Sequence, residues 1–205
     1  TNAKPEEIQK IFSDSFYENE FGTVGVKTES EDESLKVIEV TTYRTESGYS
    51  DKRHPDKVKF ADKLEHDLER RDFTMNAIAM KLKAISYKLE AEDETEVIDP
   101  YGGQQDIHNK LIKAVGDPEA RFNEDALRMM RAVRFAATLS SGGGSASGGD
   151  FTIEEKTHAA ITKLHAHLDH ISAERIHDEL IKLLGGDHAA AGIELLRETG
   201  LLTYI

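Results

Sequence analysis

Arg70, Arg71 and Asp72 are consecutive residues whose side chains could serve chemistry, and Asn76 follows Asp72 by four residues. A guanidinium binds a phosphate through two parallel hydrogen bonds, and a carboxylate accepts a hydrogen bond from a ribose hydroxyl. The same residues are also typical of the charged end of a surface helix, where an Arg–Asp pair contributes little to stability. The group therefore predicts either a nucleotide site or an ordinary helix end.

A second group of candidate residues lies in RFNEDALRMMRAVR, at residues 121–134. At about 100° per residue, Arg128, Arg131 and Arg134 follow one side of a predicted helix, and Asp125 precedes Arg128 by three residues. Another side predicts a buried apolar stripe, made by Ala126, Met130, Val133 and Ala137. Three arginines without a lysine favour bidentate recognition over a solvated surface. A binding site and an exposed helix with one Asp–Arg pair are both open.

Two further polar segments indicate mainly structural roles. The sequence DPYGG at residues 99–103 is typical of a turn that starts a helix. Ser172 is a suitable N-cap for the segment that follows it. Arg175 is expected to pair with Glu179 four residues later, so this helix is predicted to brace its neighbours.

Length and composition indicate a soluble globular protein of one or two domains, with 205 residues, 38% hydrophobic and 32% charged. The net charge of −13 is unusual for a nucleic-acid binder. Taken alone, this charge favours a small-molecule or protein partner. Binding of RNA would require a local stripe of basic side chains.

Several classes of protein are disfavoured. The chain has no cysteine, which excludes disulfides and thiolate metal sites and agrees with a reducing cytoplasm. No apolar run of about 18 residues occurs, so no membrane-spanning helix is expected, and no leader indicates secretion. The nine histidines include four between residues 165 and 177, but their spacing fits no standard zinc site.

The elements that must position these residues change in type near residue 100. A short helix is predicted to begin at Pro5. Strands are predicted at four places, namely 21–27, 35–43, 85–90 and 94–98. Residues 45–58 carry no apolar period and are predicted to form a mobile loop. The segment 68–80 is predicted to begin as a helix.

From Tyr101 onward the pattern is helical. It is interrupted by SSGGGSASGG at residues 140–149, a flexible linker by composition that is either natural or engineered. The predicted fold class is therefore α+β. A mixed α/β head over residues 1–100 is followed by an all-helical neck over residues 101–205.

Taken in order, these segments resemble class II tRNA nucleotidyltransferases, the CCA-adding enzymes, and the related bacterial poly(A) polymerases. The resemblance covers almost the whole chain except the linker. It rests on text that matches in fixed order: NAKPEEIQKIF, FGTVGV, VIEVTTYR, YSDKRHPDKVKF, DLERRDFTMNAIAM, IDPYGGQQDI, AVGDPEARFNEDALRMMRAVRFAA and ISAERIHDELIKLL. It implies a partial nucleotidyltransferase head of the polymerase-beta-like type, with a mixed sheet, before the helical neck, which would bind RNA.

The resemblance also implies a role for each candidate residue. Nucleotide binding falls on eight of them: Arg70, Arg71, Asp72, Asn76, Asp125, Arg128, Arg131 and Arg134. The first four match the motif that binds ribose and phosphates, the next two match the amino-acid template for the base, and the last two would hold the triphosphate. A flexible loop that takes part in switching from C to A matches residues 41–58, including Arg44, Tyr49 and Arg53.

The template role has a chemical basis. Cytosine and adenine both present an exocyclic amine beside a ring-nitrogen acceptor, whereas uracil and guanine present a carbonyl in the corresponding place. Asp125 as acceptor beside Arg128 as donor would therefore select C and A. Against U or G the same pair would leave buried polar groups unpaired, which is costly.

By the same resemblance, the tRNA 3′-hydroxyl attacks the α-phosphate of CTP or ATP and pyrophosphate leaves, with two Mg²⁺ ions assisting. The family's metal carboxylates lie in a Gly-Ser-x-x-Asp-x-Asp segment, which the resemblance places shortly before the point where this chain begins. Glu39, on a predicted strand, is a candidate accessory carboxylate, but one carboxylate does not hold two Mg²⁺ ions. Three explanations are open: a second chain or segment supplies the rest of the head, the sequence is trimmed from a longer protein, or the chain has been shortened deliberately.

The leading hypothesis is a cytoplasmic tRNA nucleotidyltransferase that adds C, C and A. A poly(A) polymerase, or an enzyme that adds only CC or only A, shares the same motifs. A nucleotide- or RNA-binding module without catalysis is the alternative from another class. A pure scaffold role leaves the arginine stripe without a purpose.

Overall fold

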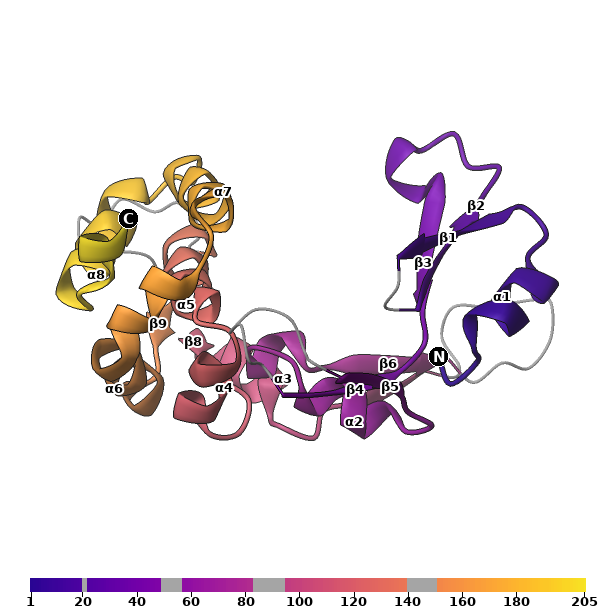
Figure 1. Cartoon of the computed structure of the whole chain (residues 1–205), viewed down its shortest axis with the longest axis horizontal. Coiled ribbons are helices and arrows are strands. Elements are labelled where there is room, and N and C mark those ends of the chain that lie inside the picture. Colours follow the sequence, from indigo (N-terminus) through magenta and orange to yellow (C-terminus); the bar gives the residue numbers. More distant parts are fainter. Residues whose placement is uncertain (20–21, 49–56, 83–94, 140–150) are drawn as a thin grey trace. The chain divides into compact units, whose positions relative to one another are not determined.

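The computed structural model describes residues 1–19, 22–48, 57–82, 95–139 and 151–205 (Figure 1). The described residues form two compact units, one within 1–48 and 57–70 and the other within 71–205. Each unit has a hydrophobic cluster of its own. The division follows Arg70, whereas the predicted boundary near residue 100 concerned functional domains and stays a prediction.

The first unit begins with a helix packed on a small sheet. Helix α1 (Pro5–Ile11) starts at a proline, whose fixed φ suits the first helical turn. Three antiparallel strands follow in the order β1 (Ser15–Asn19), β2 (Thr23–Lys27) and β3 (Val37–Thr41), with the short 3-10 helix η1 (Glu33–Leu35) before β3. Ile8 packs against Val24 and Val26, and all three are buried. The predicted helix and both strands of this part are confirmed.

The rest of the first unit corrects one prediction. Strands β4 (Arg44–Ser47) and β5 (Lys57–Phe60) pair antiparallel, with Arg44 opposite Phe60, and α2 (Leu64–Glu69) follows. The two ends of the predicted loop 45–58 are therefore strands. These two strands carry no alternating apolar pattern that could have predicted them. The tendency to form a strand depends mainly on packing against the neighbouring strand, which a short sequence segment does not reveal. Residues 49–56, at the centre of that prediction, lie outside the described part.

The helix predicted from residue 68 is also wrong for most of its length. Helix α2 ends at Glu69, and Phe73 is extended with φ −125° and ψ 151°. Phe73 forms a β-bridge with Ala114, and the Thr74 N–H donates to the Lys113 carbonyl at 2.9 Å. The backbone of this segment therefore forms hydrogen bonds with residues about 40 positions later in the chain, which helix propensity within the segment does not predict.

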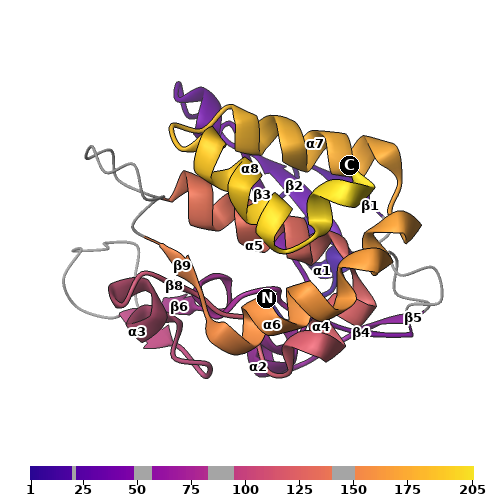
Figure 2. The ribbon, with the colours of Figure 1, turned by 90° about the vertical axis from the view of Figure 1, so that its left-hand side faces the viewer.

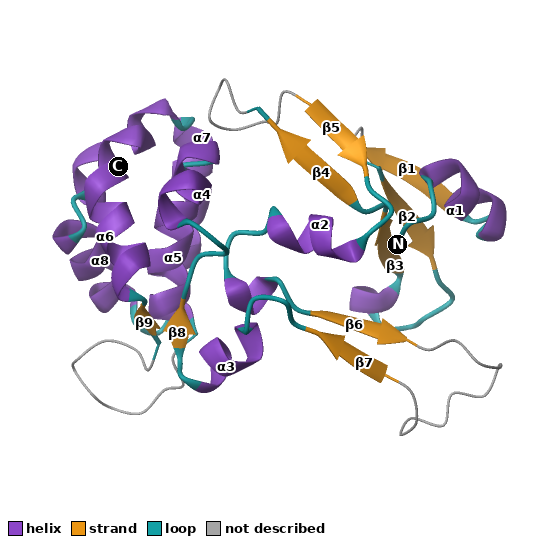
Figure 3. Ribbon diagram, turned by 90° about the horizontal axis from the view of Figure 1, so that it is seen from below, coloured by secondary structure: helices purple, strands orange, loops and turns teal. Residues whose placement is uncertain are grey.

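The second unit contains a hairpin beside a group of helices. After the 3-10 helix η2 (Thr74–Asn76), strand β6 (Ala79–Leu82) pairs antiparallel with β7 (Thr95–Ile98). The predicted strand 94–98 is confirmed, while the predicted strand 85–90 lies outside the described residues. Figure 3 shows α3 (Gly103–His108) between this hairpin and the short strand β8 (Leu111–Ile112).

Helices dominate the remainder of the second unit. They are α4 (Pro118–Glu124), α5 (Leu127–Thr138), α6 (Glu155–Leu164), α7 (Ala173–Leu184) and α8 (Ala189–Glu198), with 3-10 helices η3 (His165–His170) and η4 (Leu201–Tyr204). Helix α5 lies at the centre, with α7 and α8 packed on it and α6 packed on α4 (Figure 2). None of the helices in the described ranges is long and apolar enough to cross a membrane.

The neck is not all-helical, because β8 pairs in parallel with β9 (Thr152–Ile153). Ile112 in this pair is fully buried, which explains why two short extended segments persist among helices. The predicted apolar stripe is confirmed, since Ala126, Met130, Val133 and Ala137 are all buried. This stripe places the opposite edge of α5, with its arginines, toward the polar contacts described next.

Candidate functional site

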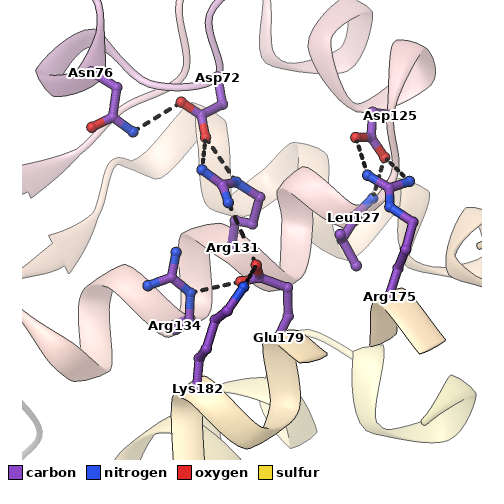
Figure 4. Close-up of polar contacts among 9 residues, drawn as sticks. All are labelled: Asp72, Asn76, Asp125, Leu127, Arg131, Arg134, Arg175, Glu179 and Lys182. Atoms are coloured by element: carbon purple, nitrogen blue, oxygen red, sulfur yellow. Dashed lines mark hydrogen bonds and ion pairs between the residues drawn. The ribbon is translucent and has the colours of Figure 1, made fainter. Parts of the chain in front are cut away.

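Asp72 is the centre of a polar cluster in the second unit (Figure 4). Asp72 lies just before η2, and the residue as a whole is only 9% exposed. Oδ1 accepts hydrogen bonds from the Phe73 N–H at 2.8 Å and from Asn76 Nδ2 at 3.0 Å. Oδ2 accepts from Arg131 Nε at 2.9 Å and forms an ion pair with Arg131 Nη2 at 2.8 Å. The fold thus joins two of the predicted motifs, which are 59 residues apart.

The charge state of Asp72 follows from these contacts. Burial raises the pKa of the Asp72 carboxyl, but the charge of Arg131 and the hydrogen bonds from Asn76, Arg131 and the Phe73 N–H together outweigh it. The net pKa is below the ordinary value, so Asp72 is ionised at neutral pH. An ionised carboxylate with polar neighbours is suited to accept from a hydroxyl group.

Glu179 on α7 is a second buried carboxylate, and it was not among the predicted site residues. It is 3% exposed. Its Oε2 accepts from Arg134 Nε at 2.6 Å, and its Oε1 lies 3.5 Å from Arg131 Nη1 and 3.4 Å from Lys182 Nζ. Burial raises its pKa, yet the hydrogen bond and charge of Arg134, with the charges of Arg131 and Lys182, lower it further than burial raises it. Glu179 therefore stays charged and gathers the arginines of α5.

An aromatic ring lies against the same arginines. The guanidinium carbon of Arg134 is 4.1 Å from the centroid of the Phe135 ring, and that of Arg131 is 5.3 Å away. Phe135 itself packs edge-on against Phe73 at 5.8 Å between centroids. Cation–π contacts of this kind restrict a guanidinium without using its hydrogen-bond donors.

Asp125 lies in a break between α4 and α5, and this break corrects the prediction of one continuous helix over 121–134. Its backbone is extended, with φ −144° and ψ 106°. The carboxylate accepts from the Leu127 N–H at 3.1 Å, so it caps the start of α5. Arg175 of α7 then grips it with two hydrogen bonds, Nη1 to Oδ1 at 3.2 Å and Nη2 to Oδ2 at 2.7 Å.

These contacts replace one ion pair that helical spacing predicted. Arg175 pairs with Asp125 and Glu179 pairs with Arg134, so the expected bond between Arg175 and Glu179 is wrong. Each of the two side chains pairs with a partly buried partner on a neighbouring segment. Such a sheltered contact is more favourable than an exposed pair within one helix.

Arg128 is held at the end of α4. Its Nη1 donates to Glu124 Oε2 at 2.7 Å and to the Arg121 carbonyl at 3.2 Å. Arg121 also pairs with Glu124, with 2.5 Å between Nη2 and Oε1. The ion pair between Glu124 and Arg128 therefore spans the break between the two helices. Asp125 and Arg128 are close in sequence, but Asp125 binds the guanidinium of Arg175 and Arg128 binds the carboxylate of Glu124.

Other predicted residues lie elsewhere. Arg70 belongs to the first unit, where it donates to Asp67 Oδ1 from Nε at 3.1 Å and Nη2 at 2.8 Å. Arg71 is exposed and belongs to the second unit. Arg44 begins β4. The remaining loop candidates, Tyr49 and Arg53, lie outside the described residues.

The predicted turn at DPYGG is confirmed. The Asp99 carboxylate accepts from the backbone N–H groups of Gly103 at 2.7 Å and Gln104 at 2.9 Å, which are the first donors of α3. Gly102 has φ +73°, a left-handed conformation that glycine adopts without strain. Ser172 is the N-cap residue of α7, but its side chain makes no capping hydrogen bond.

The described residues do not fit a metal centre. Across the described ranges, no three His, Asp or Glu side chains are arranged to hold an ion. Glu39 is exposed on β3, opposite Gly25 of β2. One exposed carboxylate does not satisfy the octahedral geometry that Mg²⁺ demands, so no chemical step is assigned to a metal here.

Comparison with known proteins assigns the chain to a family. A family model described as the Poly A polymerase head domain matches residues 1–113. The chain belongs to this family. Residues 150–205 of this poly(A) polymerase-type chain match a second model, the probable RNA and SrmB-binding site of polymerase A.

Relatives with curated names match along the whole chain. A CCA-adding enzyme of Lactobacillus helveticus (strain DPC 4571) is 43% identical over 98% of this chain and 44% of its own length. One from Geobacillus sp. (strain WCH70) is 44% identical over 100% of this chain and 45% of its own length. The chain thus spans less than half the length of these relatives.

Solved structures agree with the fold. The CCA-adding enzyme of Bacillus stearothermophilus in complex with CTP aligns with a TM-score of 0.78 at 40% identity, covering 100% of this chain and 43% of that one. A tRNA nucleotidyltransferase complexed with a primer tRNA and an incoming ATP analog aligns with a TM-score of 0.68 at 28% identity, covering 98% and 49%. The predicted nucleotidyltransferase head followed by a helical portion is confirmed.

Proposed function

We propose that this chain carries the nucleotide-selecting residues of an enzyme that adds C, C and A to the 3′ end of tRNA, using CTP and ATP. The observation that carries the proposal is the 43–44% identity with relatives named CCA-adding enzyme, which extends over the whole chain. The cluster of Asp72, Asn76 and Arg131 supports it, because it gathers a charged acceptor and donors that suit a nucleotide.

In this proposal Asp125 and Arg128 read the base. Within the described part, Asp125 Oδ1 accepts two hydrogen bonds and Oδ2 accepts one, so Oδ2 keeps a lone pair for an exocyclic amine. Arg128, fixed by Glu124, supplies the donor for the neighbouring ring nitrogen. Cytosine and adenine offer this pattern, whereas uracil and guanine would place a carbonyl against the carboxylate.

The ribose and phosphates are assigned to the neighbouring residues. Asp72 accepts from a ribose hydroxyl, with Asn76 beside it, and Arg70 and Arg71 belong to the same motif. Arg134 suits the triphosphate, because within the described part its Nη groups donate to no other residue and its Nε is anchored on Glu179. Arg131 joins both regions, since its guanidinium contacts Asp72 and Glu179.

The reaction proposed is an in-line displacement. The tRNA 3′-oxygen forms a bond to the α-phosphorus and its proton passes to solvent water. The bond between the α-phosphorus and the oxygen that bridges it to the β-phosphorus breaks, and pyrophosphate leaves with that oxygen. The residues described above bind and orient the nucleotide, which is the larger part of catalysis in phosphoryl transfer. A requirement for Mg²⁺, the loop role of Arg44, Tyr49 and Arg53, and a cytoplasmic location stay predictions from the resemblance and composition.

A replacement experiment tests the proposal. This chain takes the place of the matching 206-residue region in the CCA-adding enzyme of Geobacillus sp. (strain WCH70), and the chimaera is incubated with tRNA that lacks its CCA end, CTP, ATP and Mg²⁺. We expect addition of C, C and A in order, as with the unaltered relative. A folded chimaera that incorporates neither nucleotide would contradict the proposal.

A second candidate is a poly(A) polymerase, which the description of the matching family model favours. The same incubation separates the two functions. Repeated addition of A without prior addition of C would indicate the polymerase, and binding of CTP or ATP without any incorporation would indicate a binding module.

A further inference from the structure

Helix α7 presents two charged side chains, one turn apart, to different parts of the nucleotide-selecting region. Arg175 reaches Asp125 at the α4–α5 break, and Glu179 reaches the arginines of α5. Helix α7 packs directly on α5. Figure 4 shows Arg175 directed at Asp125, and Glu179 directed at Arg131 and Arg134. One residue of α7 therefore contacts Asp125, which is proposed to read the base. Another residue of α7 contacts the residues proposed to bind ribose and phosphate.

The contact of Arg175 fixes the direction of the Asp125 carboxylate. Asp125 is the C-cap residue of α4, where its backbone N–H donates to the Arg121 carbonyl, but its side chain accepts from the Leu127 N–H through Oδ1 alone. The two-pronged grip sets the plane of the carboxylate, because a guanidinium and a carboxylate align both pairs of atoms. The grip is sheltered, since the side chains of Arg175 and Asp125 are 23% and 16% exposed. It therefore decides where the remaining lone pair of Oδ2 points.

The contact of Glu179 lies further along α7 and is made with the arginines of α5. Its carboxylate binds Arg134 directly, and it also lies near Arg131, which in turn binds Asp72. The chain of contacts ends at residues assigned to ribose and phosphate. Among the side-chain hydrogen bonds and ion pairs of the described residues, those of Asp125 are with Leu127 and Arg175, which are not members of this chain. A change at Glu179 should therefore alter the binding of every nucleotide in the same way.

We infer that α7 controls base choice and nucleotide binding separately, with Arg175 as a positioning residue for base selection and Glu179 as a positioning residue for ribose and triphosphate. The inference deepens the proposed function and rests on it. Neither residue needs to contact the substrate, because each acts through the side chain that it orients. Preorganised polar groups discriminate only when they are held in the productive geometry.

The test measures nucleotide choice in the chimaera described above. Arg175→Lys keeps the charge but loses the planar fork, and Glu179→Gln keeps the shape but loses the charge. The kcat and KM for CTP, UTP, ATP and GTP are determined for each variant, together with its melting temperature. The matched controls are Arg197→Lys and Glu194→Gln, which alter an ion pair on α8 whose side chains are 64% and 53% exposed.

For Arg175→Lys we expect the preference for CTP over UTP, and for ATP over GTP, to fall about tenfold, since a charge-assisted contact of the template is lost. For Glu179→Gln we expect KM for CTP and ATP to rise about tenfold while base preference is unchanged. Both control variants should leave preference and KM unchanged. Arg175→Gln, which keeps one donor for the carboxylate, replaces the lysine variant should that variant fail to fold.

The possible outcomes distinguish a failure of the proposed function from a failure of the inference about α7. A chimaera with native residues that does not select CTP and ATP contradicts the proposed function, and the inference falls with it. A selective chimaera whose folded Arg175 variants retain full base preference overturns the inference alone. Equal losses for all four nucleotides in both the Arg175 and Glu179 variants would show a merely structural helix and would also overturn it.

Discussion

Replacing Asp72 by alanine should destabilise the second unit measurably. The substitution removes three hydrogen bonds, from the Phe73 N–H, Asn76 and Arg131 Nε, and the ion pair with Arg131 Nη2. Among the described contacts it leaves Arg131 its 3.5 Å contact with Glu179 and its cation–π contact with Phe135. Removing one partner of a fully buried ion pair costs about 3–5 kcal/mol, whereas an exposed pair is worth about 1 kcal/mol or less.

The burial of this pair decides the magnitude. The side chain of Asp72 is 10% exposed and that of Arg131 is 31% exposed, so water can partly solvate the guanidinium that is left behind. We therefore expect a loss of about 2–3 kcal/mol in the free energy of unfolding, between the two limits. In a chain of this size the melting temperature should fall by about 5–10 °C.

Urea unfolding followed by far-UV circular dichroism measures this loss, because the chain has no tryptophan and the second unit is rich in helix. Asp72→Asn keeps an acceptor for the Phe73 N–H and should cost about half as much. Glu194→Ala, which removes an exposed partner of Arg197, is the matched control and should cost under about 1 kcal/mol. A loss below about 1 kcal/mol for Asp72→Ala would refute the reasoning, as would equal losses for the alanine variant and the control. In the chimaera, Asp72→Ala should weaken use of CTP and ATP alike, and a selective loss of ATP would contradict its ribose role.

Three other predictions concern Asp125, the two buried carboxylates and Gly103. Asp125→Ala should lower the affinity for CTP and ATP and relax base choice in incorporation assays; undiminished discrimination against UTP and GTP would rule out the template role. Asp72 and Glu179 have pKa values lowered from 3.8 and 4.5, so the stability they contribute is present above those values and should be lost as the pH falls below about 4.5, as acid titration of the helical signal would show. Gly103→Ala should cost about 1–3 kcal/mol in urea unfolding, because the added methyl group would overlap the Thr74 carbonyl and crowd Ile78; a stability equal to that of the native chain would disprove this close approach.

Local patterns in the sequence predicted much of the fold. Pro5 predicted the start of α1, and the Val-rich segment at 21–27 predicted the strand β2. The apolar stripe of α5 predicted the face that meets the core. These predictions succeeded because they depend on periods of two or 3.6 residues and on backbone preferences that operate within one element. The strands at the two ends of the segment 45–58 were not predicted. Strand pairing can join segments whose amino-acid composition gives no indication that they are strands.

The candidate site shows the same division. Residue types alone selected Asp72, Asp125 and the arginines of α5, and the resemblance attached nucleotide binding to them. Glu179 was assigned a partner on its own helix, since spacing of four residues was the only neighbourhood that the sequence offered.

The amino-acid sequence by itself determined which side chains can bind a nucleotide, which faces are buried, and the family to which the motifs are similar. Only the tertiary structure decided that Arg131 binds Asp72, that Arg175 rather than Arg128 grips the Asp125 carboxylate, and that Glu179 gathers the α5 arginines. The physical reason is that buried charges must find partners of opposite charge wherever packing places them. Those partners here lie 45 to 59 residues away along the chain.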